Sequence, residues 1–277
     1  MGTHPDLTWR ILRHAPAPGP WNMAVDEAIL EQVARGDSPP TLRLYAWAPP
    51  CLSLGRAQPA SDVDQEALAR LGWGLVRRPT GGRAILHTSE LTYAVIARLH
   101  HPTMQGGVLE SYQRISLALL KALDLLTLPA RADQKYEIPA GLRPDGPVCF
   151  EIPSNYEITA GGKKLVGSAQ ARRKDGVLQH GTLPLCGDLT RITAVLAFPD
   201  PFSRSQAAQS VLQHATTVES LLNRVVGWDE AANAFEIGFA QTFGLNLIHD
   251  ELTPAEQSQA QILYAEKYDH PDWTHKI

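Results

Sequence analysis

Short runs of alternating apolar and polar residues dominate the first hundred positions of the chain. Alternation with a period of two is the pattern of a half-buried β-strand, and Gly, Pro or charged residues bound each run. The pattern predicts strands over residues 9–13, 41–47, 51–54, 74–78 and 90–97. A glycine-bearing loop over residues 79–83 separates the last two strands.

Apolar residues at helical spacing predict helices over residues 23–35, 62–71 and 109–126. Asn22 is the expected N-cap of the first helix, because its side chain can accept a hydrogen bond from a free backbone N–H. Gly36 is the expected end of that helix. The last of the three helices is strongly amphipathic.

The second half of the chain begins with a proline-rich loop over residues 129–147 and continues as a β-meander. The predicted strands of the meander span residues 156–159, 163–172 and 177–185, with turns at residues 160–162 and 174–176. Beyond residue 188 the chain is predicted to be mostly helical. Together these elements predict an α+β fold with a mixed sheet, because strand–helix alternation is too irregular for a doubly wound α/β fold. We expect one domain over residues 1–277, with a helical C-terminal part over residues 188–277.

Composition narrows the class of protein. The chain has 277 residues, 44% of them hydrophobic, and a formal net charge of −4, which argues against a nucleic-acid-binding protein. Two basic stretches, residues 77–78 and 172–174, either face an acidic partner or are solvated. No signal-peptide core is present, the longest apolar run is too short to span a membrane, and three cysteines make no disulfide framework. The expected setting is soluble, reducing and cytoplasmic.

Several short motifs lack the residues that their chemistry requires. Residues 162–168 resemble a phosphate loop but have no lysine after the second glycine. Neither a dinucleotide-binding glycine motif nor a Gly-x-Ser-x-Gly nucleophile elbow occurs. His87 and Glu90 stand three apart without further ligands nearby in the sequence, so no metal and no cofactor is expected.

Two glycine-bearing loops remain, "RRPTGGRAILH" and "AGGKKLVGSAQ". Glycine pairs let a backbone approach a ligand closely and present amide groups to an anion or a carbonyl. Lys164 lies in the second loop, fifteen residues after Cys149. The other two cysteines, Cys51 and Cys186, are expected to be structural thiols.

The two loops resemble signatures of the lipoate/biotin protein ligase and octanoyltransferase superfamily, as do "NMAVDEAIL", "LRLYAWAPPCLSLGRAQ" and "LYAEKYDHPDW". The resemblance covers nearly the whole chain. It implies a mixed sheet with packed helices, and the attachment of an acyl or lipoyl group to a lysine of a lipoyl carrier domain. Ligases of the superfamily carry an Asn-Asp-Ile-type stretch at this place. This chain has "CFEIPSNYEI" there instead, and that stretch resembles the one in the cysteine-dependent octanoyltransferases.

The resemblance implies a catalytic pair, Cys149 and Lys164. Cys149 would take the octanoyl group of octanoyl-acyl carrier protein as a thioester, and a lysine of a lipoyl domain or glycine cleavage H protein would receive it as an amide. A thioester is already activated, so no ATP is needed. Lys164 would lie at the reacting carbonyl and favour the Cys149 thiolate. Backbone amides around Gly81, Gly82 and Gly167 are expected to stabilise the oxyanion.

The remaining candidates are substrate-binding side chains: Arg78, Thr80, Arg83, His87, Ser168 and Gln170. Arg78 and Arg83 are expected to contact the donor's phosphopantetheine or the acidic surface of a carrier; the alternative is that both are solvated. His87, like His180, is either a pocket residue that carries protons or a structural histidine. Ser168 and Gln170 either bond the acyl carbonyl or complete the strand. The apolar pocket wall is expected from Leu75, Val76, Ile85, Leu91 and Val166.

Three functions stay open at this level. The first is cysteine-dependent octanoyl transfer from acyl carrier protein. The second is an ATP-dependent lipoate–protein ligase or a carrier-to-carrier amidotransferase, and Cys149 does not exclude the latter. The third is a scaffold without activity that binds lipoyl domains. The sequence leaves the acceptor, the use of lipoate and the oligomeric state undetermined.

Overall fold

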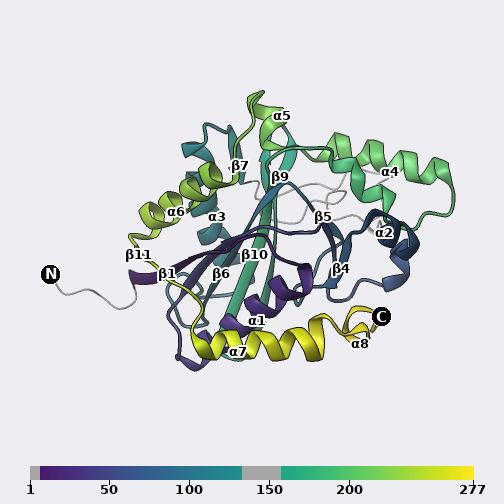
Figure 1. Ribbon diagram of the computed structural model, residues 1–277. Helices are drawn as coiled ribbons and strands as arrows, with labels where there is room; N and C mark the ends of the chain where they lie inside the picture. Colours follow the sequence, from purple (N-terminus) through teal and green to yellow (C-terminus); the bar gives the residue numbers. More distant parts are fainter. Residues whose placement is uncertain (1–6, 133–156) are drawn as a thin grey trace.

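A large mixed sheet forms the centre of the protein (Figure 1). The computed structural model describes residues 7–132 and 157–277. Eight strands follow the order β11-β1-β2-β6-β10-β9-β8-β7. Their bounds are β1 (Thr8–Arg13), β2 (Thr41–Tyr45), β6 (Glu90–Arg98), β7 (Ala130–Ala132), β8 (Ile158–Ala160), β9 (Lys163–Arg173), β10 (Gly176–Pro184) and β11 (Asn246–His249). Strand β1 runs parallel to β2 and β11, and the other neighbours are antiparallel.

A second, three-stranded sheet lies beside the large one, on the right in Figure 1. It consists of β3 (Cys51–Leu54) between β4 (Gly74–Arg77) and β5 (Ile85–His87). Helices α2 (Gln65–Leu71) and α4 (Pro201–His214) lie at this end of the molecule, and residues of both join the core of the small sheet. The observed architecture confirms the predicted α+β fold with a mixed sheet.

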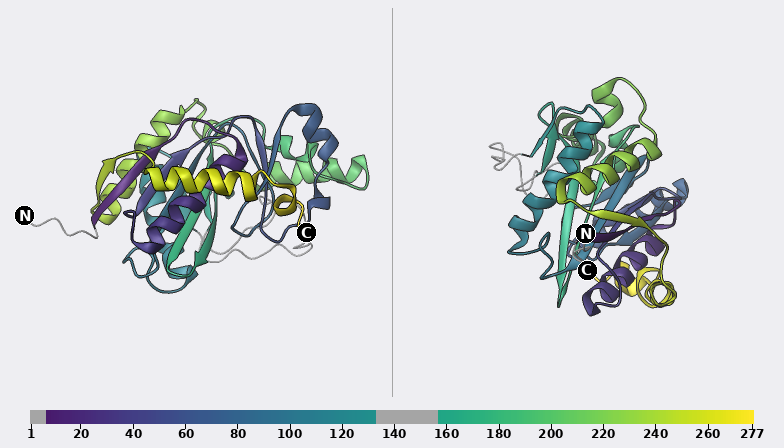
Figure 2. Two further views of the ribbon diagram at one scale, coloured as in Figure 1. Left: turned by 60° about the horizontal axis from the view of Figure 1, so that its bottom comes forward. Right: turned by 90° about the vertical axis from the view of Figure 1, so that its left-hand side faces the viewer.

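Helices cover both faces of the large sheet, as the right-hand view of Figure 2 shows. One face packs against α3 (Val108–Leu125) and α6 (Trp228–Phe243), and the other against α1 (Gly19–Arg35) and α7 (Pro254–Leu263). Shorter helices are α5 (Val218–Leu222), α8 (Pro271–Thr274), the 3₁₀ turns η2 (Ala60–Asp62) and η4 (Leu189–Ala194), and the π turn η5 (Tyr264–Tyr268). Each face therefore buries its own apolar core. No helix within the described ranges is long and apolar enough to cross a membrane.

Helix α1 starts earlier than predicted, and Asn22 is not its N-cap. The helix begins at Gly19 after the N-cap Pro18, and Pro20 stands in its first turn, where the fixed φ of proline suits the helix. Asn22 is buried inside the helix, where its side-chain amide donates to the carbonyls of Ala17 (3.1 Å) and Ala46 (3.0 Å). Gly36 ends the helix in the left-handed conformation, with φ of 87°, as predicted.

The structure contains three short strands that the sequence pattern did not predict, β5, β7 and β11. Each has three or four residues, too few to show a period. Strand β11 interrupts the C-terminal part that was predicted to be mostly helical, because it pairs with β1 at the opposite end of the chain. Most of the predicted loop over residues 129–147, and the start of the strand predicted over residues 156–159, lie outside the described residues.

The arginines at positions 77 and 78 do not form a surface patch. Arg77 is fully buried and donates to the carbonyls of Gly55 (2.9 Å), Gln58 (2.5 Å) and Thr274 (2.8 Å). Both proposed readings of this pair as a basic surface were therefore wrong. The reason is that a guanidinium offers five donors, which here satisfy backbone carbonyls of segments that meet only in the folded chain.

Candidate active site

A cavity lies between the two sheets and opens to solvent. One helix, six strands, Trp47 after β2, and the loop after β4 contribute its wall. The lining residues are Met23, Tyr45, Trp47, Ser53, Arg78, Gly81, Gly82, Ile85, His87, Thr92, Gly167, Ser168, Ala169, His180, Gly181 and Thr182. The two glycine loops, about 80 residues apart in the chain, therefore meet at one cavity.

Six of the predicted site residues line this cavity: Arg78, Gly81, Gly82, His87, Gly167 and Ser168. Thr80 does not line the cavity itself, but its hydroxyl is hydrogen-bonded to the ring of the lining residue His180. Among the described residues, Arg83, Lys164 and Gln170 are not part of the lining. Of the predicted apolar wall only Ile85 is present. Val76, Leu91 and Val166 are buried in other cores instead, and Leu75 packs against the core of the small sheet.

Arg78 holds the first glycine loop in place. The side chain is buried, and its Nη2 donates to the carbonyls of Gly81 and Arg83, both at 2.7 Å, while Nη1 donates to the carbonyl of Ser53 at 3.0 Å. The interpretation of Arg78 as a solvated surface arginine is therefore wrong. The loop also needs Gly55, because a Cβ there would lie 1.8 Å from the carbonyl oxygen of Gly82.

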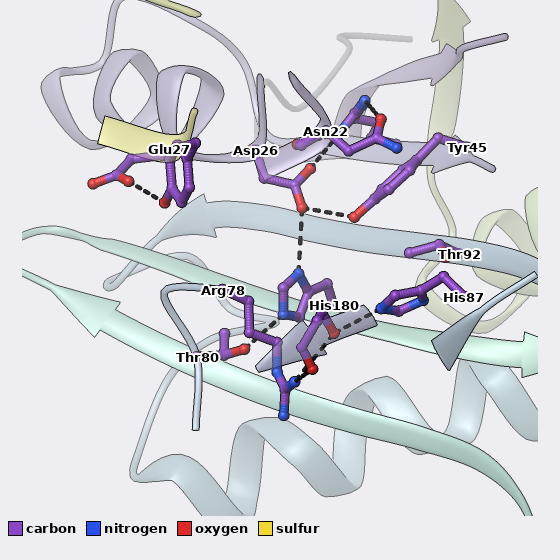
Figure 3. A network of polar contacts seen from close by, with 12 residues as sticks. Asn22, Asp26, Glu27, Tyr45, Arg78, Thr80, His87, Thr92 and His180 are labelled. Carbon is purple, nitrogen blue, oxygen red and sulfur yellow. Dashed lines mark hydrogen bonds and ion pairs between the residues drawn. The ribbon is translucent and has the colours of Figure 1, made fainter. Parts of the chain in front are cut away.

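His180 stands between a carboxylate and a hydroxyl, as Figure 3 shows. Its Nδ1 lies 3.3 Å from Asp26 Oδ2, and its Nε2 lies 2.7 Å from Thr80 Oγ1. Asp26 also accepts from Arg43 Nη1 (2.6 Å) and the Tyr45 hydroxyl (2.9 Å). Burial lowers the pKa of His180, and, against the opposing effect of burial, Arg43 and His180 lower the pKa of Asp26. At neutral pH a neutral His180 therefore donates from Nδ1 to a charged Asp26 and accepts from Thr80 at Nε2.

His87, on β5 of the small sheet, has the same kind of surroundings. Its Nδ1 lies 2.6 Å from Glu90 Oε1, and its Nε2 lies 2.8 Å from Ser53 Oγ. The Trp47 ring stacks on the His87 ring with centroids 3.8 Å apart. Thr92 donates to the same Glu90 oxygen and accepts from Trp47 Nε1. His87 is thus a fixed part of the cavity wall.

Lys164 is buried and forms an ion pair with Glu157. Its neighbour Lys163 is half-exposed and donates to the carbonyl of Leu212. The two lysines therefore have different partners, as expected for consecutive residues of a strand, whose side chains point to opposite faces. Cys149 lies outside the described residues, and its distance to Lys164 stays untested. Cys51 is buried, and burial raises the pKa of its thiol, which fits the structural interpretation of this cysteine.

Ser168 and Gln170 belong to a polar network on the α3 face of the sheet. Ser168 Oγ lies 2.7 Å from the Tyr93 hydroxyl, whose pKa burial raises to about 12. Gln170 donates to Gln179 (3.0 Å) and accepts from Arg172 Nε (2.9 Å). This network supports the interpretation that Gln170 completes the strand, rather than bonding substrate in the cavity.

Sequence reasoning did not assign several residues that line the cavity or support its wall. They are Met23, Asp26, Tyr45, Trp47, Ser53, Thr92 and Thr182. Five of them lie within the stretches "NMAVDEAIL" and "LRLYAWAPPCLSLGRAQ", which carried the family resemblance. That resemblance was the available signal for these five, because their spacing has no recognisable catalytic pattern. Within residues 7–132 and 157–277, no three His, Cys, Asp or Glu side chains gather as a metal site would need.

Comparison with known proteins identifies the class to which this fold and cavity belong. A family model described as the lipoyl protein ligase A/B catalytic domain matches residues 18–240. The chain belongs to this family, and it is an enzyme of the acyltransferase class.

Relatives of nearly the same length refine the comparison. The chain is 41% identical over 271 residues to octanoyltransferase LipM of Symbiobacterium thermophilum, covering 97% of this chain and 98% of the relative. It is 42% identical over 273 residues to octanoyltransferase LipM of Kyrpidia tusciae, covering 97% and 99%. A solved bipartite lipoate protein ligase from Thermoplasma acidophilum superposes with a TM-score of 0.80 at 28% identity, over 97% of this chain and 96% of that one. A lipoate-protein ligase A bound with ATP gives 0.79 at 27% identity, over 97% and 98%.

Proposed function

We propose that the protein transfers an octanoyl group from octanoyl-acyl carrier protein, through a thioester on Cys149, to the acceptor lysine of a lipoyl domain such as glycine cleavage H protein. The observation that carries the proposal is the convergence of both glycine loops on one mostly carbon-lined cavity. Full-length relatives named octanoyltransferase support the choice of acyl group. The proposal needs no cofactor and includes a cytoplasmic setting, where thiols stay reduced.

The chemistry divides into two acyl transfers. The Cys149 thiol loses its proton and attacks the thioester carbonyl of the donor as a thiolate; the phosphopantetheine sulfur leaves and takes up a proton in exchange as the acyl-enzyme forms. The neutral acceptor lysine then attacks the acyl-enzyme, gives up a proton, and releases the Cys149 thiol as an amide forms. Lys164 would supply positive charge next to the thiolate, and the Glu157 carboxylate would hold that ammonium in position.

Apolar burial of the alkyl chain supports selection of chain length. Each buried methylene contributes about 0.8 kcal/mol, which is a factor of about four in affinity. The carbon-rich part of the wall comes from Met23, Tyr45, Trp47 and Ile85. Selection of chain length would follow from how many methylenes this part of the wall can bury.

An ATP-dependent lipoate ligase is the second candidate function. The observation in its favour is the superposition on solved lipoate protein ligases, with TM-scores of about 0.8 over nearly the whole chain. A carrier-to-carrier amidotransferase remains a variant of the first proposal, since it would use the same cysteine.

Intact-protein mass spectrometry with octanoyl-acyl carrier protein, in the absence of ATP, tests the proposal. We expect a gain of one octanoyl group that hydroxylamine removes, that Cys149→Ala abolishes, and that the matched variant Cys186→Ala retains. A chase with H protein is expected to move the group to the acceptor lysine.

Other outcomes would identify the alternatives. Carrier modification only with free octanoate or lipoate and ATP would contradict the cysteine mechanism in favour of a ligase. An adduct formed only from octanoylated H protein would indicate an amidotransferase.

A further inference from the structure

The polar side chains of the cavity wall satisfy one another, with one exception. His87, His180, Ser53 and Thr92 have the partners given above, and Arg78 is bound to carbonyls. Three further side chains of the wall form hydrogen bonds: Tyr45 with Asp26, Trp47 with Thr92, and Ser168 with Tyr93. Thr182 is the exception: within the described part of the chain its Oγ1 is buried and has no hydrogen-bond partner.

An unpartnered buried hydroxyl costs free energy unless a ligand or water satisfies it. Thr182 lies on β10, and its side chain is only 1% exposed. An octanoyl group has a single polar atom, the carbonyl oxygen, which can accept a hydrogen bond. We propose that Thr182 Oγ1 donates this hydrogen bond to the carbonyl oxygen of the bound acyl group, and is a substrate-binding residue of the site. This inference rests on the proposed acyl-transfer function.

Strand register agrees with this placement and gives the direction of the acyl chain. Thr182 pairs with Gly167 on β9, and His180 pairs with Ala169 two residues further along. Lys164 precedes Gly167 by three residues, roughly 10 Å along the strand, so Thr182 marks the end of the cavity nearer to Lys164. The carbonyl would therefore lie at the Thr182 end, and the alkyl chain would extend past His180 toward Met23.

Isotope-edited infrared spectroscopy tests the hydrogen bond directly. The probe is an octanoyl-pantetheine analogue in which a methylene replaces the thioester sulfur, with ¹³C at the carbonyl, so that it binds but cannot transfer the acyl group. In the full-length protein we expect a carbonyl stretch at lower frequency than in an aprotic solvent. Thr182→Val should raise the frequency and weaken binding by about tenfold, whereas Thr182→Ser should keep the low frequency.

Thr193→Val is the matched control, because it removes a buried hydroxyl that lies outside the cavity wall and donates to the Thr190 carbonyl. Its carbonyl frequency should match that of the original protein. If the probe binds and Thr182→Val leaves the frequency unchanged, the role of Thr182 is refuted while acyl binding stands. If the probe does not bind the unaltered protein at all, the proposed function fails, and the role of Thr182 fails with it.

A stability measurement separates substrate binding from a structural role. Replacing an unsatisfied hydroxyl by a methyl group of the same shape is neutral or stabilising in the free protein. We therefore expect Thr182→Val to melt at the same or a higher temperature without ligand, while it binds the probe more weakly. A clearly lower melting temperature without ligand would show that the hydroxyl has a structural partner, and would overturn the inference.

Discussion

At the scale of single residues, the centre of the protein depends on charged side chains that are removed from water. Arg43 and Asp26 are both fully buried and pair at 2.6 Å, and Arg10 pairs with the buried Glu256 at 2.6 Å. A buried charge is tolerated only when it is paired and fully hydrogen-bonded. His14 completes the Arg43 site by accepting from its Nε at 2.9 Å. The histidine must be neutral to accept, which makes folding sensitive to pH.

His14 gives a pH prediction with a definite sign. Burial and the nearby Arg43 lower the pKa of His14 to about 3 in the folded state, against an ordinary value of 6.5. Below pH 6.5 the unfolded chain takes up a proton that the folded chain refuses, so stability falls as the pH falls toward 3. In His14→Gln this loss should be smaller, by at most about 1.4 kcal/mol per pH unit.

Urea unfolding at pH 7, 6 and 5 measures this difference. The exposed His275→Gln serves as the control and should follow the unaltered protein at each pH. Parallel curves for His14→Gln and the unaltered protein would contradict the prediction.

At the scale of elements, the site depends on contacts between loops and strands that lie far apart in the chain. The loop after β4 rests on the end of β3, where the Gly55 backbone contacts the Gly82 carbonyl. The hairpin of β9 and β10 brings the second glycine loop to the same cavity. Because these contacts are between backbones, small changes in volume should have large effects on the cavity.

Gly55→Ala tests that dependence. The added methyl group would lie 1.8 Å from the Gly82 carbonyl oxygen, and a backbone group cannot rotate away as a flexible side chain can. We expect loss of more than about 2 kcal/mol of stability, of the order of an overpacked core, and loss of acyl-enzyme formation. Gly227→Ala, with open space around its Cβ position, should cost less than about 1 kcal/mol. Chemical unfolding and mass spectrometry of the acyl-enzyme give the two readouts; equal behaviour of both variants would refute the argument.

At the scale of the whole molecule, the C-terminal segment encloses the small sheet. Arg77 on β4 donates to the Thr274 carbonyl, and Trp273 Nε1 donates back to the Arg77 carbonyl at 2.7 Å. The last carbonyl, of Ile277, accepts from the Ala60 amide at 2.8 Å. Figure 1 shows α8 and the C-terminus next to β4. The last residues of the chain thus stabilise the sheet that carries one wall of the cavity.

Arg77→Lys should loosen this connection. A lysine keeps the charge but cannot reach three separate carbonyls, so the variant leaves buried acceptors unsatisfied at a cost of about 2–4 kcal/mol. We expect faster cleavage of the C-terminal segment in limited proteolysis, along with a lower midpoint of unfolding. The exposed Arg70→Lys on α2 should change neither measurement. Unchanged proteolysis of Arg77→Lys would mean that other contacts hold the segment.

The sequence by itself determined the fold class and most of the long strands and helices, and it predicted six of the binding residues that line the cavity, together with Ile85 of its wall. Periodicity sufficed for elements such as α3 and β10, because a long apolar face requires one secondary structure whatever its partner. Only the tertiary structure decided that β11 joins β1, that Arg77 and Arg78 are buried, and which polar groups of the wall satisfy one another. A short strand, or the hydrogen-bond state of a hydroxyl such as that of Thr182, depends on neighbours in space, and those neighbours come from distant parts of the chain.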